Sequence, residues 1–417
     1  MTAARIARGA TLAVAAVVWC VCAWLLARTS VPTLHLSGLD VHHSFSPRTL
    51  DRTESFGRGI DLLWALGVAA ELVALVVLTR MMPPRSRGIG LGRIGTAVIV
   101  GMVLLVTLWF VALPFSLAQL WWEHHWGLGP FDVGAWLAGQ WSSLGPEAVT
   151  ALATIVLLVG LAGRFRRWWL VAGPVVVAIA AVFALLSGWL AAAAAHPLRN
   201  PQLAADGRRL ARIEHVAGTP IKVQDVSKWT DQPNAFTSGF GPSARVVLWD
   251  TLLDGRFTRG EEDAVIAHEL GHVRSRHIVK SIGWTALVVL PVLWLLDIVT
   301  RRRGGVGDPA NLPFAILVLT VLGLLVTPLE NAVSRRYEAE ADWRSLNATR
   351  DPASTRKLFQ AFARTSLEDP KPPLWDYLWL ETHPTVAQRV KMVDEWRKRE
   401  AARRASGRPS RGGPGSP

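Results

Sequence analysis

The sequence predicts a mainly α-helical, polytopic membrane protein with seven transmembrane helices and a polar domain that carries a small β element. Half of its 417 residues are hydrophobic and its mean hydropathy is +0.27, which is more than a soluble domain usually carries. The hydrophobic residues are gathered into seven runs, each about long enough to cross a bilayer as a helix. This clustering, more than the total, predicts the fold class.

The seven apolar runs form a group of five before residue 196 and a group of two after residue 280. The first run could also be a signal peptide, but the runs that follow it favour a membrane-spanning helix. Pro174, inside the fifth run, is tolerated in a membrane helix. The predicted spans are residues 9–27, 60–79, 94–117, 146–163, 168–195, 281–299 and 311–329.

The polar stretches predict the domain organisation. The predicted segments are 1–195 as an N-terminal transmembrane region, 196–280 and 330–396 as two parts of one polar domain, 281–329 as the last two spans, and 397–417 as a basic, disordered tail. Runs of β-branched residues predict the strands in the polar domain. The predicted elements are strands over 220–226 and 244–249, a turn-rich loop over 231–242, and helices over 201–216, 331–346, 351–366 and 383–399.

The formal charge of +13 narrows the expected partners. The basic residues lie in short loops between apolar runs and in the tail, as is typical of the flanks of membrane helices. Contact with the lipid bilayer is therefore expected, and a nucleic-acid partner is not. The interfacial segment 121–146 is rich in Trp and carries no Lys or Arg.

Residues 268–272 read H-E-L-G-H, the H-E-x-x-H pattern. On a helix, His268 and His272 share one face, so both imidazoles can bind one Zn²⁺ while Glu269 takes a proton from a water. Thr258 and Glu261 fit a capping box at the start of that helix. The alternative is a chance match on an ordinary surface helix, and the motif alone does not exclude it.

A tetrahedral zinc site needs a third protein ligand. His277 lies five residues after His272, which on a continuous helix is nearly the opposite side, so it is expected to be a poor ligand. Spacing alone does not choose among the acids after the last span, which are Glu330, Glu338, Glu340 and Asp342. Glu338 and Asp342 share a helix face, so one could bind the metal while the other orients a ligand.

Several further motifs occur in a familiar order. Residues 331–342 read NAVSRRYEAEAD, His383-Pro384 is followed by Arg389, and DVSK, NAF and VLWDTLL precede the H-E-L-G-H helix at 225–228, 234–236 and 247–253. From about residue 9 to 396, this pattern resembles the type-1 CaaX prenyl protease family of polytopic membrane zinc metallopeptidases and their HtpX-type relatives. The family is also similar in having two spans between the histidine pair and the glutamate.

The resemblance implies a zincin-like metallopeptidase domain and one Zn²⁺ per chain. It implies that His268, His272 and Glu338 bind the zinc, and that Glu269 is the general base. His383 would donate a hydrogen bond to the developing oxyanion. The residues expected to line the substrate groove are Asn234, Val246, Val247 and Leu248, and those expected to fix the ligands are Arg335, Asp342 and Arg389.

The predicted function is that of a membrane-embedded zinc metalloendopeptidase acting on peptide or membrane-protein substrates. The resemblance implies that the substrates are prenylated CaaX tails. A role in general membrane-protein quality control is the other possibility. One alternative is a non-catalytic scaffold or metal-handling protein, which we would expect to have lost Glu269 or Glu338. Another is a signal-transducing sensor metalloprotease, which would need a ligand-binding domain that the residues after Arg397 are too few and too polar to supply.

The expected location is the cell membrane, with two hypotheses for orientation. The amino terminus and the loops at 80–93, 164–167 and 301–303 would share one side and are rich in Arg. By the positive-inside rule, this places the polar domain outside the cytoplasm. The resemblance and the basic tail favour the cytosolic side instead.

Overall fold

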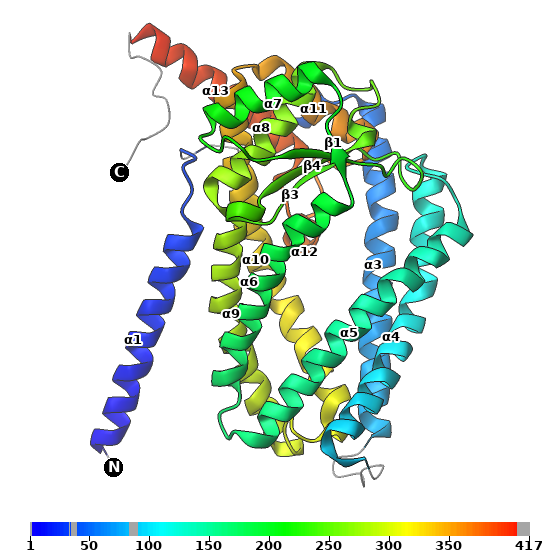
Figure 1. Ribbon diagram of the computed structural model, residues 1–417, viewed down its shortest axis with the longest axis vertical. Helices are drawn as coiled ribbons and strands as arrows, with labels where there is room; N and C mark the ends of the chain where they lie inside the picture. Colours follow the sequence, from blue (N-terminus) through cyan, green and yellow to red (C-terminus); the bar gives the residue numbers. More distant parts are fainter. Residues whose placement is uncertain (1, 33, 35–39, 83–90, 407–417) are drawn as a thin grey trace. The chain divides into compact units, whose positions relative to one another are not determined.

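The computed structural model describes residues 2–32, 34, 40–82 and 91–406, and it is mainly helical (Figure 1). The chain divides into two compact units. The first, called the apolar unit below, comprises Met1–Arg28, Arg58–Ala184 and Ile278–Glu330; the second, called the polar unit, comprises Thr29–Gly57, Leu185–His277 and Asn331–Pro417. Residues 83–90 of the predicted basic loop and 407–417 of the predicted tail lie outside the described residues.

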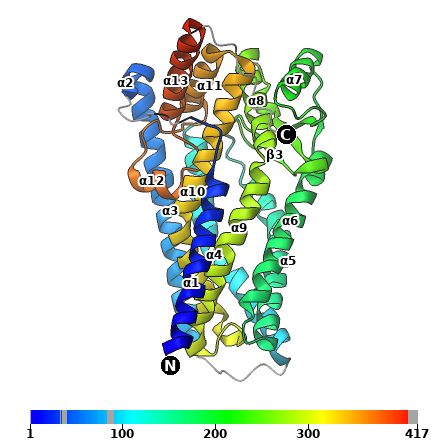
Figure 2. The same cartoon turned by 90° about the vertical axis from the view of Figure 1, so that its left-hand side faces the viewer.

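The apolar unit is built from long helices that run in a common direction (Figures 1 and 2). It draws on α1 (Thr2–Ala27), α3 (Pro47–Met81), α4 (Gly92–His125), α5 (Val133–Arg164), α6 (Trp169–Ala193), α9 (His277–Thr300) and α10 (Leu312–Thr349), with short 3₁₀ turns η3 (Arg301–Arg303) and η4 (Pro309–Asn311). Among the described residues, six segments are long and apolar enough to cross a membrane: Pro47–Met81, Gly92–His125, Val133–Arg164, Trp169–Ala193, His277–Arg303 and Pro309–Thr349. The predicted first span contributes a shorter apolar stretch, Ala13–Ala27.

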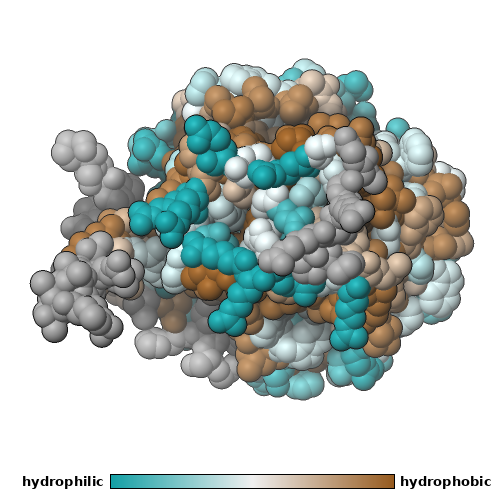
Figure 3. All heavy atoms as spheres, turned by 90° about the horizontal axis from the view of Figure 1, so that it is seen from below, coloured by the Kyte–Doolittle hydropathy of each residue, from teal (hydrophilic) through white to brown (hydrophobic). Residues whose placement is uncertain are grey.

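The apolar unit has a small buried core and a large exposed apolar surface. Leu75, Ala97 and Leu104 are buried together, whereas Val73 and Phe183 are 62% and 67% exposed. Exposed side chains of this kind are what a lipid-facing surface requires. Figure 3, which views the molecule from below, shows hydrophilic residues gathered in the middle of that face with hydrophobic residues around them.

Two helices extend beyond the apolar runs predicted as spans. The fourth span was expected to begin at Pro146, but α5 begins at Val133 and keeps Pro146 inside it. The Asp132 side chain accepts a hydrogen bond from the Ala135 N–H and caps this earlier start. The predicted seventh span and the helix predicted over 331–346 are one continuous helix, α10.

The polar unit combines helices with a four-stranded sheet. Its helices are α2 (Val41–Ser44), α7 (Pro201–Ile213), α8 (Arg259–Ser275), the second half of α10, α11 (Pro352–Thr365), α12 (Leu374–Trp379) and α13 (Val386–Ala405), with 3₁₀ turns η1 (Gly241–Ser243) and η2 (Asp250–Leu252). The strands are β1 (His196–Pro197), β2 (Ile221–Gln224), β3 (Ala235–Ser238) and β4 (Arg245–Trp249), in the order β1-β2-β4-β3. β2 and β4 are parallel, and the other pairs are antiparallel. The part of the predicted tail up to Ala405 is helical, because α13 extends that far.

The strand order corrects the predicted substrate-groove residues. Val246, Val247 and Leu248 belong to β4, which is paired with β2 on one side and β3 on the other, and all three are fully buried. A strand paired on both sides cannot accept a further strand, so β4 cannot be the edge that holds a peptide. The free edge on this side of the sheet is β3, which lies within the segment predicted to be a loop.

One hydrophobic core holds the polar unit together. Ile266 and Leu270 of α8 pack there with Leu346 of α10 and Phe359 of α11, and each is at most 2% exposed. The capping box predicted for α8 is confirmed: the Thr258 N–H and hydroxyl donate to Glu261 Oε2 at 2.6 and 2.7 Å. The core therefore fixes the faces of α8 and α10, and the cap fixes where α8 begins.

Candidate metal centre

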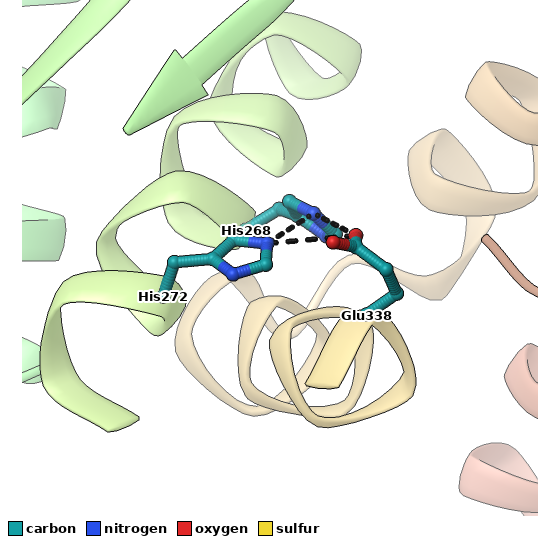
Figure 4. Close-up of side chains that lie close together, drawn as sticks. All are labelled: His268, His272 and Glu338. Carbon is teal, nitrogen blue, oxygen red and sulfur yellow. Dashed lines mark hydrogen bonds and ion pairs between the residues drawn. The ribbon is translucent and has the colours of Figure 1, made fainter. Parts of the chain in front are cut away.

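Two helices of the polar unit bring the predicted ligands together (Figure 4). Helix α8 carries His268 and His272 one turn apart, and α10 carries Glu338 opposite them. Glu338 Oε2 lies 3.1 Å from His268 Nε2 and 3.5 Å from His272 Nε2. The two Nε2 atoms are 3.0 Å apart. One donor atom of each side chain therefore points at a common centre.

The chemistry of this donor set fits a divalent metal. The three donor atoms all lie within 4.8 Å of one another, and two imidazole nitrogens with one carboxylate oxygen form a set that Zn²⁺ takes. Desolvation lowers the pKa of His268, but its hydrogen bonds to Asp342 and Glu338 outweigh that and raise the pKa to about 10. The site therefore favours a positive charge at this place.

Asp342 and Arg389 support His268. Asp342 Oδ1 accepts a hydrogen bond from His268 Nδ1 at 2.8 Å, so Nε2 is the ring nitrogen that faces the common centre. Arg389 donates two hydrogen bonds to the same carboxylate, at 2.8 and 2.9 Å. The Asp342 and Arg389 side chains are 1% and 8% exposed, so this is a buried, bidentate ion pair.

His272 has a different support, which the sequence did not reveal. Its Nδ1 lies 2.8 Å from Nδ1 of His277, whose Nε2 lies 3.1 Å from Glu340 Oε2. A carboxylate only accepts, so His277 donates to Glu340 and accepts from His272. The Ser30 N–H and hydroxyl also donate to Glu340, at 2.8 and 2.6 Å. His272 is thereby held in the tautomer that presents Nε2 to the centre.

The expectation that a continuous helix would carry His277 away from the site is wrong. Helix α8 ends at Ser275, and Arg276 adopts a left-handed conformation with φ 54° before α9 begins at His277. The turn returns the His277 ring toward His272, and Tyr337 stacks on its other face at 4.5 Å between centroids. His277 contacts a candidate ligand and is not part of the triad itself.

Glu269, the predicted general base, is fixed by strand β3. Thr237 Oγ1 lies 2.8 Å from Glu269 Oε2 and 2.9 Å from its carbonyl oxygen, so one hydroxyl holds both the side chain and the backbone. Glu269 lines a cavity of about 350 Å³ that also exposes His268, Asn234 and His383. Asn234 precedes β3 and is exposed, as a residue that meets substrate must be.

His383 reaches the same centre from the loop before α13. Its Nε2 lies 3.2 Å from Glu338 Oε2, and its side chain is 49% exposed. Desolvation lowers the pKa of His383, and the Glu338 carboxylate raises it by more. Burial, with the carboxylates of Asp376 and Glu368, raises the pKa of neighbouring Glu381 to about 7.

Arg335 was expected to hold a metal-ligand side chain in place, but it does not contact one. It donates instead to the carbonyl oxygens of Tyr377 and Glu381, at 2.7 and 2.5 Å. These carbonyls belong to α12 and to the turn just before His383. Arg335 therefore positions the segment that carries His383. The pattern of acidic and basic residues over 331–342 did not indicate that Arg335 bonds this segment and not a metal ligand.

Residues 197–397 match the profile described as Peptidase family M48. The chain is 31% identical over 219 residues to a protease HtpX homolog of Acidiphilium cryptum, and the match covers 51% of this chain and 68% of that protein. The chain belongs to peptidase family M48. The predicted resemblance to HtpX-type and CaaX prenyl proteases is thus confirmed.

Two other relatives match over smaller fractions of their length. An uncharacterized metalloprotease of Bacillus subtilis, YhfN, is 29% identical over 210 residues, covering 48% of this chain and 49% of that protein. A CAAX prenyl protease 1 homolog of Oryza sativa is 27% identical over 201 residues, covering 44% and 46%. The chain therefore spans about half the length of these two relatives. Membership in a metalloprotease family implies a metal cofactor.

A solved structure extends the fold comparison to most of the chain. The crystal structure of Saccharomyces mikatae Ste24p superposes with a TM-score of 0.66 at 19% identity, covering 90% of this chain and 96% of that one. At this identity the likeness concerns the fold alone. Together with the six apolar helices, it makes this M48 member an integral multi-pass membrane protein.

Proposed function

We propose that the chain is a membrane-embedded zinc metalloendopeptidase that hydrolyses peptide bonds in peptide or membrane-protein substrates. The observation that carries the proposal is the convergence of His268, His272 and Glu338 on one centre, beside a cavity that His268 and Glu269 line. In this proposal, residues 196–280 and 330–396 form a zincin-like peptidase domain. Helix α1 is a seventh span in addition to the six apolar helices.

His268 and His272 would bind one Zn²⁺ through their Nε2 atoms, and Glu338 would bind it through a carboxylate oxygen. When bound, zinc acts as a Lewis acid that polarises a carbonyl group and lowers the pKa of water. Asp342 and His277 would keep the two imidazoles neutral at Nε2, because each accepts the hydrogen bond of an Nδ1–H. The chain's own contribution is thus to fix the tautomer of both ligands.

Glu269 would act as the general base and then return the proton to the leaving nitrogen. Thr237 holds one of its oxygens, which leaves the other available to the attacking water. His383 Nε2 would donate to the carbonyl oxygen as negative charge develops on it. Its half-exposed side chain, next to Glu338, has room to turn toward a bound peptide.

The peptide substrate would lie along β3, extended, with Asn234 at one end of the strand. β3 has one paired neighbour, β4, and its other edge is where backbone hydrogen bonds could hold a further strand. The proposed substrates, CaaX-type prenylated tails and misfolded membrane proteins, can both present such an extended segment. The cell membrane is the proposed location, with the orientation to be tested by a protease-accessible tag after Pro417 in intact cells.

The deciding experiment compares wild-type protein with Glu269→Gln. The substitution keeps the size of the side chain and the hydrogen bond to Thr237 but removes the base. We expect unchanged zinc content and a fall in casein or prenyl-peptide cleavage of at least about 100-fold. Glu395→Gln, whose carboxylate pairs with Lys398 of the same helix α13, is the control. Equal cleavage by Glu269→Gln and wild type would contradict the proposed function.

A further inference from the structure

A second cavity of the polar unit is lined by six arginines. Its volume is about 930 Å³, and it lies among the ends of α7, α8, α10 and α13 together with Ser30 and Pro32. We call it the arginine pocket. The six are Arg274, Arg276, Arg344, Arg350, Arg399 and Arg403. None of the predicted catalytic or metal-binding residues lines it, so it is a separate site.

The pocket has fewer acids than arginines. Its two acidic residues are Glu214 and Glu400. Glu214 pairs with Arg344 at 3.2 Å, and Glu400 pairs with Arg350 at 2.9 Å. Within the described part of the chain, Arg274 and Arg276 form no ion pair. The pocket therefore has an excess of positive charge that an anion could neutralise.

Two tryptophans hold guanidinium groups in place. The Arg350 guanidinium lies 5.8 Å from the Trp396 ring centroid, and that of Arg399 lies 6.0 Å from the Trp343 ring centroid. Trp396 is 5% exposed, and its Nε1 donates to Asn347 Oδ1 at 3.0 Å. A guanidinium resting on a fixed ring loses less freedom when it binds an anion. Part of the pocket is thus organised before any ligand arrives.

Two of the residues that line the pocket lie close in the sequence to apolar helices. Arg276 immediately precedes the apolar segment His277–Arg303, and Ser30 follows α1, which ends at Ala27. Residues at such positions lie at the level of the lipid headgroups. The phosphate of an anionic lipid is therefore the anion nearest to the pocket, and arginine forks match phosphate oxygens in geometry.

We propose that the arginine pocket binds the phosphate group of an anionic phospholipid headgroup. Phosphate chemistry is favoured because six arginines line one cavity, and a membrane source is favoured because Ser30 and Arg276 lie close in the sequence to the ends of apolar helices. The proposal is independent of peptidase activity, since no residue of the metal centre takes part. Inorganic phosphate and acidic peptide segments are the competing occupants.

The test uses the full-length protein in detergent and counts retained lipid by native mass spectrometry. Arg276→Asn and Arg350→Asn are combined, because both residues have φ 54° and Asn tolerates the left-handed conformation. We expect wild type to retain phosphatidylglycerol about tenfold more tightly than phosphatidylcholine, and the double variant to lose that preference. Arg208→Gln with Arg364→Gln removes two exposed arginines outside the pocket and should change nothing.

Two outcomes would overturn the proposal: retention of phosphatidylglycerol by the double variant as tightly as by wild type, or equal retention of phosphatidylcholine by wild type. Displacement of the lipid by equimolar inorganic phosphate or by an acidic peptide would assign the pocket to that ligand instead. Thermal unfolding checks that the variants are folded. If the double variant is unstable, Arg276→Asn alone is used, with an expected loss of at least about threefold.

Discussion

The two histidines of the candidate metal centre are the same residue type, one helical turn apart, yet they are supported in different ways. His268 rests on Asp342, which forms a buried ion pair with Arg389. His272 rests on a second imidazole, His277, which passes the interaction on to Glu340 and Ser30. In the first support, a charged carboxylate contacts the histidine directly. In the second, the carboxylate of Glu340 is reached only through the His277 ring.

This difference separates two tasks. Each support fixes the tautomer of its histidine, but the ion pair also joins α10 to α13, because Asp342 and Arg389 come from those helices. The second support joins α8 and the start of α9 to Glu340 of α10 and to the segment after α1. We therefore expect damage to the first to reduce both folding stability and metal affinity, and damage to the second to reduce mainly metal affinity.

The largest effect is expected for Asp342→Asn. The substitution leaves Arg389 buried beside a neutral amide, which costs about 3 kcal/mol of unfolding free energy. We expect zinc affinity to fall about 100-fold, the upper end for loss of a ligand's hydrogen-bond partner. Chelator competition and thermal unfolding measure the two quantities, with Asp51→Asn, an exposed carboxylate on α3, as control. Unchanged stability would show that the two supports do not differ as described.

His277→Phe should lower zinc affinity about tenfold with a smaller loss of stability. Phenylalanine preserves the stacking on Tyr337 but removes both hydrogen bonds, so His272 Nδ1 loses its acceptor. His277→Gln, which can still accept a hydrogen bond, is the matched variant and should recover part of the affinity. A loss of stability as large as that of Asp342→Asn would contradict the comparison.

Glu340→Gln is expected to lower zinc affinity only about threefold. The amide oxygen can still accept from His277 or Ser30, and no buried arginine is left unpaired in a bidentate contact. The measurement is the same chelator competition, run beside His277→Phe. An effect larger than that of His277→Phe would mean that the charge of Glu340, and not the tautomer of His277, supports His272.

Ser30→Ala should have the smallest effect. It removes one hydrogen bond to Glu340, while the Ser30 N–H remains as a donor. We expect about 1 kcal/mol or less of lost stability and zinc affinity within about twofold of wild type. Ser142→Ala, whose hydroxyl bonds only within its own helix, is the control. A tenfold loss of zinc would place Ser30 among the essential supports.

Local sequence information was enough for one half of the site. The helix of the H-E-L-G-H motif and its Thr258–Glu261 cap follow from residues within one or two turns. The shared face of Glu338 and Asp342 also follows from spacing. The choice among four acids does not, because it depends on how α8 and α10 pack. Glu330 is exposed, and Glu340 turns to His277 and Ser30.

The features missed from the sequence are those that depend on distant segments. The order of strands makes β3 the free edge and buries Val246 to Leu248 in β4. The break between α8 and α9 occurs at Arg276, without the glycine that usually marks a left-handed helix end. A pattern search therefore had no reason to bring His277 back to His272, or to pair Thr237 with Glu269.

The two positions of H-E-x-x-H that the pattern leaves open are both constrained in this protein. Leu270 is fully buried in the core of the polar unit. At Gly271, a methyl group would come within 3.3 Å of the Cα of Ala341, so the absence of a side chain lets α8 and α10 approach closely enough for Glu338 to meet the histidines. The motif is therefore half of a matched pair of helices. Anyone who grafts the five residues onto another scaffold must transplant the face of α10 with them.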